Sequence, residues 1–435
     1  MKPELKTVKL SDIIFDQVLY PRDDHDPALA QKYSESIENI EAKGRFISVD
    51  SENNLLDGKH RWLGYRTAYE DDPTRDIKVF VYSITEEREK FALACELNND
   101  FGLQLSLKSK KIDAIRLYGY GYPYDFIAGK LSVGKAKIVD WLSRTVKEQK
   151  DQQNTKIMAM WLACHTQQEI AEVVGLSREA IDKILNGRED EPGLVQKFQE
   201  NQSTKLNFLD WTEDKDIPLY NIWKQQNKSS KIKYPGNTEE HWVENLLYLY
   251  TQPLDIVVDP FAGGGSTIDV CKHRGRRYFV SDRKPIKVRE TEIRQIDIVD
   301  GLPPVPRWKD VRLVYLDPPY WWQSKEKYSK DPTDLGNMEL EEFNKTLSGL
   351  ICGFAKKLHP GSFIALIIQP TQWNAPEHQY TDHVADILRL VKLPIEMRIS
   401  APYESQQNNA QMVAWAKENR KLLVLSREIV VWRVD

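Results

Sequence analysis

Short continuous apolar runs recur through the second half of the chain, and each ends at a turn signal. Runs of this length predict strands buried on both faces, as in a parallel sheet. The clearest runs occupy residues 255–258, 278–280, 311–316 and 363–368. An antiparallel hairpin that closes the sheet is predicted by two further runs, 420–425 and 428–432. With helical patterns between the runs, residues 205–435 are expected to form an α/β domain.

The middle of the chain, residues 105–190, has helical patterns and contains a faint internal repeat. Residues 127–138 align with residues 170–181, and each copy has the pattern of two short helices joined by a turn. In each copy an alanine is followed four positions later by a turn residue and ten positions later by isoleucine: Ala128, Ser132 and Ile138, then Ala171, Gly175 and Ile181. That spacing is typical of DNA-reading helix-turn-helix units, whose second helix enters the major groove.

Residues 1–104 have the mixed pattern of a compact α/β unit. Within it lies Gly58-Lys59-His60-Arg61, a glycine turn followed by the basic start of a helix. A helix N-terminus attracts anions, because its unpaired N–H groups and its dipole both favour negative charge. Lys59, His60 and Arg61 are therefore candidate contacts for a DNA backbone or a nucleotide. The alternative is a basic helix with a purely structural role.

Net charge limits where nucleic acid can bind. The 435 residues carry a formal charge of −4, so a DNA-binding surface must be local. Between residues 103 and 150, ten basic and four acidic side chains give a local charge of +6, which suits phosphate contacts. We expect DNA contacts from Lys135 and Lys137 in the first helix-turn-helix copy. The second copy is richer in acidic residues, and Arg178 is its candidate.

The cysteines and the apolar runs bear on the compartment. The four cysteines form no C-x-x-C pair, which predicts reduced thiols and no metal site: Cys95, Cys164, Cys271 and Cys352. No apolar run approaches 18 residues, so a membrane span is not expected. We therefore expect a cytoplasmic protein without a metal.

Two motifs follow two of the predicted buried strands. The first, D-P-F-A-G-G-G-S-T from Asp259 to Thr267, is a glycine-rich turn that opens a helix. The second is Asp317-Pro318-Pro319-Tyr320, directly after the run at 311–316. Open α/β sheets bind their ligands outside the carboxyl ends of the strands. Both motifs are therefore expected at the ligand-binding edge.

In this order the motifs resemble those of the S-adenosylmethionine-dependent DNA methyltransferases that act on exocyclic amino groups. The resemblance implies a Rossmann-like class I methyltransferase fold, with the methyl donor at the first motif and the base at the second. It also implies an acidic contact after the second strand, where Asp282 follows Asp259 by 23 positions, near the ~20 typical of such folds. A polar contact is implied after the third strand, where Asp297 is the choice and Asp300 the alternative. Solvated loop carboxylates are the other interpretation of these two.

The cofactor residues that follow from the resemblance lie mainly in the glycine-rich turn. A segment at 233–237 also resembles the family segment that precedes the cofactor strand. The expected cofactor contacts are Asp259, Pro260, Phe261, Ala262, Gly263, Gly265, Ser266, Thr267, Asp282, Asp297 and Asn237.

The D-P-P-Y motif has a chemical logic of its own. The lone pair of an exocyclic amino group is delocalised into the base, so the nitrogen is a poor nucleophile. The Asp317 carboxylate and the Pro318 carbonyl can accept hydrogen bonds from its two N–H groups, which exposes the lone pair. Pro318 and Pro319 fix the backbone and offer no N–H, and Tyr320 can stack on a flipped base. In the family, Asp at the first position accompanies adenine N6 more often, while cytosine N4 remains the alternative.

The N-terminal pattern resembles the ParB and sulfiredoxin-like domain, whose strand, glycine turn and basic helix start bind nucleotide phosphates. The chain departs from that pattern at two places. Gly44-Arg45-Phe46-Ile47 replaces the glycine-isoleucine-glutamine-proline box, and Gly58-Lys59-His60-Arg61 replaces G-E-R-R. Nucleotide hydrolysis is therefore in doubt.

The whole combination resembles fusion proteins of prokaryotic mobile elements and viruses, for which restriction-modification is one setting. We expect a DNA methyltransferase whose partner is double-stranded DNA, with no membrane involved. A homodimer and a nucleotide at the ParB-like domain are left open. One rival is a ParB-like regulatory protein with a vestigial methylase domain, against which the intact Asp317 and glycine turn argue. The other is an RNA or protein methyltransferase, where the first motif position is more often Asn.

Overall fold

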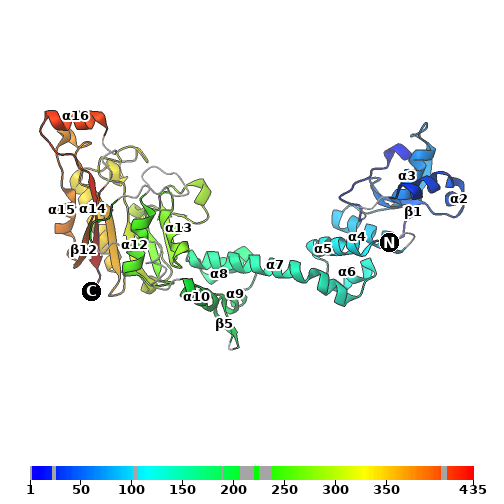
Figure 1. Ribbon diagram of the computed structural model, residues 1–435, viewed down its shortest axis with the longest axis horizontal. Coiled ribbons are helices and arrows are strands. Elements are labelled where there is room, and N and C mark those ends of the chain that lie inside the picture. Colours follow the sequence, from blue (N-terminus) through cyan, green and yellow to red (C-terminus); the bar gives the residue numbers. More distant parts are fainter. Residues whose placement is uncertain are drawn as a thin grey trace. The chain divides into compact units, whose positions relative to one another are not determined.

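The chain forms two compact units in the computed structural model, Met1–Gln152 and Gln153–Asp435 (Figure 1). The structure describes residues 2–21, 26–100, 105–188, 190–205, 220–224, 238–402 and 409–435. The division between the units falls inside one long helix, α7 (Lys135–Leu162). The domain limits expected from sequence, after residues 104 and 190, stay predictions.

The first unit begins with a mixed four-stranded sheet in the order β1-β4-β2-β3. Its strands are β1 (Glu4–Lys9), β2 (Ile47–Asp50), β3 (Leu55–Asp57) and β4 (Asp76–Tyr82). Three helices accompany it: α1 (Pro27–Ser34), α2 (Ile37–Ala42) and α3 (Lys59–Ala68). Fully buried side chains from β2, β3, β4 and α3 form the core of this sheet: Ile47, Val49, Leu55, Tyr65 and Val79.

Helices complete the first unit: α4 (Glu87–Asp100), α5 (Leu107–Gly119), α6 (Tyr124–Leu131) and the first part of α7. The turn between α6 and α7 contains Ser132 at a positive φ of 47°, and Ile127, Leu131 and Ile138 are fully buried beside it. The first predicted helix pair is therefore present, while its identity as a DNA-reading unit stays a prediction. Within the described ranges, no helix combines the length and hydropathy of a membrane span.

The second predicted helix pair belongs to the C-terminal unit. It consists of α8 (Gln167–Val174) and α9 (Arg178–Asn186), with Gly175 between them at φ 70°. A short hairpin, β5 (Gly187–Arg188) with β6 (Glu191–Pro192), and α10 (Leu194–Lys205) follow. Thr166 and Glu169 form a capping box at the start of α8, which fixes where that helix begins.

Two arginines tie the end of α7 to the sheet of this unit. The Arg277 guanidinium lies 4.1 Å from the Trp161 ring centroid, and its Nε donates to the Trp161 carbonyl at 3.3 Å. Arg294 donates to the Ala163 carbonyl at 3.1 Å. These bonds satisfy carbonyls at the end of α7 that have no partner within the helix.

A seven-stranded sheet forms the centre of the C-terminal unit, in the order β12-β13-β11-β10-β7-β8-β9. Its strands are β7 (Ile256–Asp259), β8 (Arg277–Asp282), β9 (Arg294–Gln295), β10 (Val311–Leu316), β11 (Phe363–Ile368), β12 (Ile395–Pro402) and β13 (Ser426–Arg433). The pairs from β9 across to β11 are parallel, and β13 runs antiparallel to both of its neighbours. Counted along the chain, the strands therefore stand in the order 3-2-1-4-5-7-6.

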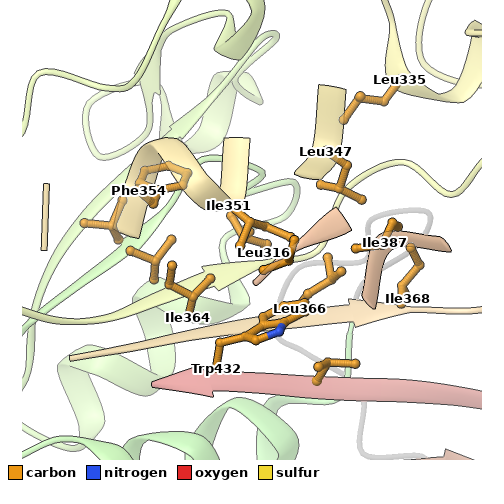
Figure 2. Close-up of a cluster of buried hydrophobic side chains, with 14 of the residues drawn as sticks. Leu316, Leu335, Leu347, Ile351, Phe354, Ile364, Leu366, Ile368, Ile387 and Trp432 are labelled. Carbon is orange, nitrogen blue, oxygen red and sulfur yellow. The ribbon is translucent and has the colours of Figure 1, made fainter. Parts of the chain in front are cut away.

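Helices cover both faces of this sheet. One face carries α12 (Glu240–Tyr250) and α13 (Ser266–His273), and the other carries α14 (Leu340–Ala355) and α15 (His383–Leu390). Side chains alternate between the faces along each strand, so Leu366 packs towards α14 while Ile367 packs towards α12. Figure 2 shows the hydrophobic cluster between the sheet and α14, with Phe354 and Ile351 of α14 above Trp432 of β13.

The predicted closing hairpin is correct for its second arm and wrong for its first. Residues 420–425 form no strand, and Leu422 is 90% exposed. Besides β11, β13 pairs with β12, which lies at the sheet edge with its first four residues exposed. An edge strand needs little apolar surface, and charged residues such as Glu396 and Arg398 interrupt the apolar pattern of β12. The strand therefore forms no apolar run in the sequence. Between the two strands lies a further helix, α16 (Ala410–Glu418).

We expect Phe354→Ala to destabilise the C-terminal unit by about 3–5 kcal/mol, because it empties a fully buried site in a close-packed cluster. Urea unfolding followed by tryptophan fluorescence measures the change. Leu422→Ala is the matched control, since its side chain is exposed and its effect should stay within about 0.5 kcal/mol. Equal effects of the two substitutions would contradict this packing.

Candidate active site

The two sequence motifs meet in one pocket of about 1480 Å³ at the carboxyl ends of β7, β8 and β10. Both motifs line it, as do the residue after β8 and the segment around residue 297. Ligand pockets commonly measure about 300–1000 Å³. The volume therefore admits two adjacent ligands of nucleoside size.

Asp259 shapes the glycine-rich turn from inside. One carboxylate oxygen accepts from the Phe261 N–H at 2.9 Å and the other from the Thr267 hydroxyl at 2.6 Å. The side chain is buried at the end of β7. That burial raises the pKa of Asp259 to about 7, with smaller contributions from the Asp317 and Asp282 carboxylates.

The glycines allow a turn that other residues would strain. Gly263 and Gly265 have φ angles of 49° and 84°, in the left-handed region that glycine adopts without cost. A Cβ on Gly265 would also lie 2.8 Å from Cδ of the buried Arg289. The turn leads into α13, whose first residues, Ser266 and Thr267, line the pocket.

Asp282 and Asp297 also line the pocket. Asp282 accepts from the Gly263 N–H at 2.9 Å, which joins the ends of β7 and β8. Asp297 pairs with Arg283 at 2.8 Å and caps a 3-10 turn through the Val299 N–H. Asp300, the alternative to Asp297, is exposed and does not line the pocket. Asn237 lies outside the described residues.

Asp317 follows β10 at the other end of the pocket. Its carboxylate accepts from the Thr238 hydroxyl on one oxygen and from the Tyr320 hydroxyl at 3.3 Å on the other. The carboxyl lies deep in the protein yet stays partly accessible through the pocket. Burial raises its pKa, and the Arg427 guanidinium opposes that rise most strongly.

Thr238 and Arg427 are pocket residues that the sequence analysis missed. Arg427 begins the core of β13, 4% exposed, with its guanidinium 4.6 Å from the Trp242 ring centroid. Its Nη1 donates to the Thr238 hydroxyl at 3.4 Å. The only available signal was an arginine just before an apolar strand, which is too common to single out.

The segment after D-P-P-Y also lines the pocket, with residues between Gln323 and Leu335. Arg283 holds it through Asp331 at 2.5 Å and Thr333 at 3.0 Å. The same guanidinium binds Asp297, so one side chain links the loop to the third strand's end.

The predicted DNA contacts of the helix pairs are exposed at helix starts. Lys135 and Lys137 begin α7 in the first unit, and Arg178 begins α9 in the second. Lys135 pairs with Asp125 at 2.8 Å, with both side chains more than half exposed. Such a pair contributes little to stability, so the ammonium stays available to an anion.

The basic start of α3 is occupied by internal contacts. Lys59 Nζ lies 4.7 Å from the Phe15 ring centroid, and His60 Nε2 accepts from the Asp26 N–H at 3.0 Å. Arg61 pairs with Asp57 at 2.6 Å and donates to the carbonyls of residues 45 and 46. These bonds support the structural alternative, and contact with DNA or nucleotide stays a prediction.

Residues 131–292 match a DNA methylase family, N6_N4_Mtase. The match covers less than half of the chain; it includes the glycine-rich turn and Asp282 and ends before Asp317. It supports a DNA methyltransferase. A search of curated proteins found no significant match.

Similar solved structures include methyltransferases and ParB proteins. TrmN from Thermus thermophilus is 15% identical, with 45% of this chain and 48% of TrmN covered and a TM-score of 0.28. A SAM-dependent methyltransferase from Archaeoglobus fulgidus is 14% identical, with 45% and 94% covered and a TM-score of 0.28. ParB from Caulobacter crescentus, complexed to the centromeric parS site, is 10% identical, with 48% and 97% covered and a TM-score of 0.24.

The chain thus spans about half the length of TrmN. With TM-scores below 0.5, these similarities add nothing to the strand order itself. That order, 3-2-1-4-5-7-6 with the seventh strand antiparallel, is the Rossmann-like α/β arrangement of class I methyltransferases. The expected fold class is confirmed.

The raised pKa of Asp259 predicts a pH-dependent stability. Its ordinary value is 3.8 and its folded value about 7, so the folded state binds the proton more tightly. Stability from this group is present below about pH 4 and is lost as pH rises to about 7. Asp259→Asn cannot ionise, so its stability relative to wild type should improve over that range. Urea unfolding at several pH values measures this, and parallel curves for the two proteins would contradict it.

Proposed function

We propose that this chain transfers a methyl group from S-adenosylmethionine to adenine N6 in DNA. The observation that carries the proposal is the meeting of the glycine-rich turn and D-P-P-Y in one pocket with room for both ligands. A carboxylate, carbonyls and an aromatic ring at one end suit a base. A glycine turn, a helix start and acidic strand ends suit a nucleoside cofactor.

The residues of the turn fit S-adenosylmethionine. Gly263 and Gly264 line the pocket together with Phe261 and Ala262, and the absence of a Cβ leaves the glycine backbone open to close approach. Gly265 does not line the pocket, and the space for its Cβ faces the buried Arg289. Asp282 would meet the ribose hydroxyls, exchanging one of its present N–H partners. The cofactor, when bound, supplies a methyl group activated by a positive sulfonium.

The other end of the pocket would prepare the target nitrogen. The Asp317 carboxylate and the Pro318 carbonyl would accept its two N–H bonds, and the Tyr320 ring would hold the base plane. Because burial raises the pKa of Asp317, this carboxylate is a stronger base than an exposed one and is suited to take the amino proton. Positioning and fixed polarity would then supply most of the rate enhancement.

Adenine is favoured because Asp stands first in the motif, as it more often does in the adenine-specific members of the family that the motif resembles. Cytosine N4 is the alternative. DNA is favoured over RNA by the family match and by the helix pairs. The exposed lysines at the start of α7 lie in the locally basic region, within the matched residues. They support a surface that neutralises phosphates.

Asp317→Ala should lower methyl transfer to duplex DNA by more than about a hundredfold, since it removes a preorganised acceptor at the reacting nitrogen. Binding of S-adenosylmethionine, measured by calorimetry, should change little. Asp310→Ala, just before the other end of β10, is the matched control and should retain transfer. Transfer by Asp317→Ala at the wild-type rate would refute the assigned role.

Replacing both Lys135 and Lys137 with Gln should weaken DNA binding and lower the salt dependence of the binding constant. The log–log slope should fall by about one for each lysine that contacts a phosphate. Fluorescence anisotropy over a salt series measures both quantities. Lys147→Gln with Lys150→Gln, further along α7, removes the same charge and should have the smaller effect; equal effects would place the DNA elsewhere.

A further inference from the structure

A buried cation lies beside the buried carboxyl of the D-P-P-Y motif. Arg427 is 4% exposed and comes from β13, more than a hundred positions from Asp317. It lines the same pocket. Burial of a charge is costly unless the charge is paired or hydrogen-bonded, so its presence calls for a reason.

We propose that Arg427, acting through the Thr238 hydroxyl, holds the Asp317 carboxylate as an anion oriented towards the target amino group. Arg427 is thus a positioning residue for the transfer reaction. The inference rests on the proposed function for its meaning, although the charge state of Asp317 can be measured without any transfer.

The hydrogen bonds have a fixed direction along this path. The Thr238 hydroxyl has a single proton, which it donates to Asp317 Oδ2. Its oxygen then accepts from Arg427 Nη1 at 3.4 Å. Tyr320 donates to the other carboxylate oxygen, Oδ1, at 3.3 Å. The two hydroxyls therefore fix the orientation of the carboxylate, and the guanidinium fixes the position of the Thr238 hydroxyl.

The electrostatics of the pocket make this support necessary. Asp317 is faced by Asp259 from β7, Tyr315 from β10, the Tyr320 hydroxyl and Arg427 from β13. Burial raises its pKa, and a second carboxyl nearby also disfavours the anion. The Arg427 charge is the largest of the influences that lower the pKa of Asp317. A protonated Asp317 would have less capacity to accept from the base.

Arginine suits the position better than lysine. The planar guanidinium lies over the Trp242 ring, at 4.6 Å from its centroid, while Nη1 reaches Thr238. A lysine ammonium would supply the charge at one point but cannot keep both contacts in a fixed geometry. Arg427→Lys therefore separates charge from orientation.

The test is the pH dependence of kcat for the full chain and its variants. Arg427→Met should move the acid limb of the profile to higher pH by about one unit or more, because an opposite charge near a carboxyl shifts its pKa by about 1–3 units. Thr238→Val should move the limb in the same direction. Arg427→Lys should restore much of the limb while kcat on the plateau stays low. KM for DNA should change little.

Arg433→Met is the matched control, on the same strand with an exposed side chain, and its profile should follow wild type. A limb unmoved in both Arg427→Met and Thr238→Val, with kcat lowered equally at every pH, would overturn the proposal. Circular dichroism identifies a variant that fails to fold; Thr238→Val, nearly isosteric, then decides.

Absence of transfer by the wild-type chain would refute the proposed function and leave this inference to a second measurement. Carboxyl ¹³C NMR, with the Asp317 signal assigned by Asp317→Asn, follows the titration directly. The Asp317 midpoint should rise in Arg427→Met and stay in place in Arg433→Met. An Asp317 midpoint that is the same in wild type and Arg427→Met would overturn the inference.

Discussion

The parallel pairing of β10 with β7 is the constraint on which the site depends. Their registers, Val314 against Val258, bring the ends of both strands to one edge of the sheet. The chain leaves β7 towards β8 on one side and returns at β10 on the other, so the strand order reverses between them. A crevice forms at such a reversal, because the connections leave in opposite directions. The glycine-rich turn and D-P-P-Y each begin at its rim.

That arrangement places two carboxyl groups with different roles, those of Asp259 and Asp317, in a pocket where water solvates them poorly. Both carboxylate oxygens of Asp259 accept hydrogen bonds from the turn that follows it, one from the Phe261 N–H and one from the Thr267 hydroxyl. Asp317 keeps its oxygens on hydroxyls that border the open pocket. The negative charge of each carboxylate makes ionisation of the other less favourable, and the charge of Arg427 lowers the pKa of Asp317. One carboxyl thus maintains the fold of the site, and the other is available for chemistry.

Local motifs and apolar runs were enough to predict the parallel strands β7, β8, β10 and β11, the glycine turn and the strand ends that carry Asp282 and Asp317. The edge strand β12 was missed because its exposed charged residues break the apolar pattern. Arg427 and Thr238 were missed because their role comes from the antiparallel return of β13, which no local pattern contains. The attachment of α7 to the sheet through Arg277 and Trp161 was hidden for the same reason. Long-range contacts of buried polar groups require the fold.

The most direct measurement is mass spectrometry of nucleosides from duplex DNA incubated with the chain and methyl-labelled S-adenosylmethionine. The account predicts label on an exocyclic nitrogen, in N6-methyladenine. Label in N4-methylcytosine would keep the chemistry and change the base. Label on a ring carbon, as in 5-methylcytosine, or label in RNA with none in DNA, would contradict the account.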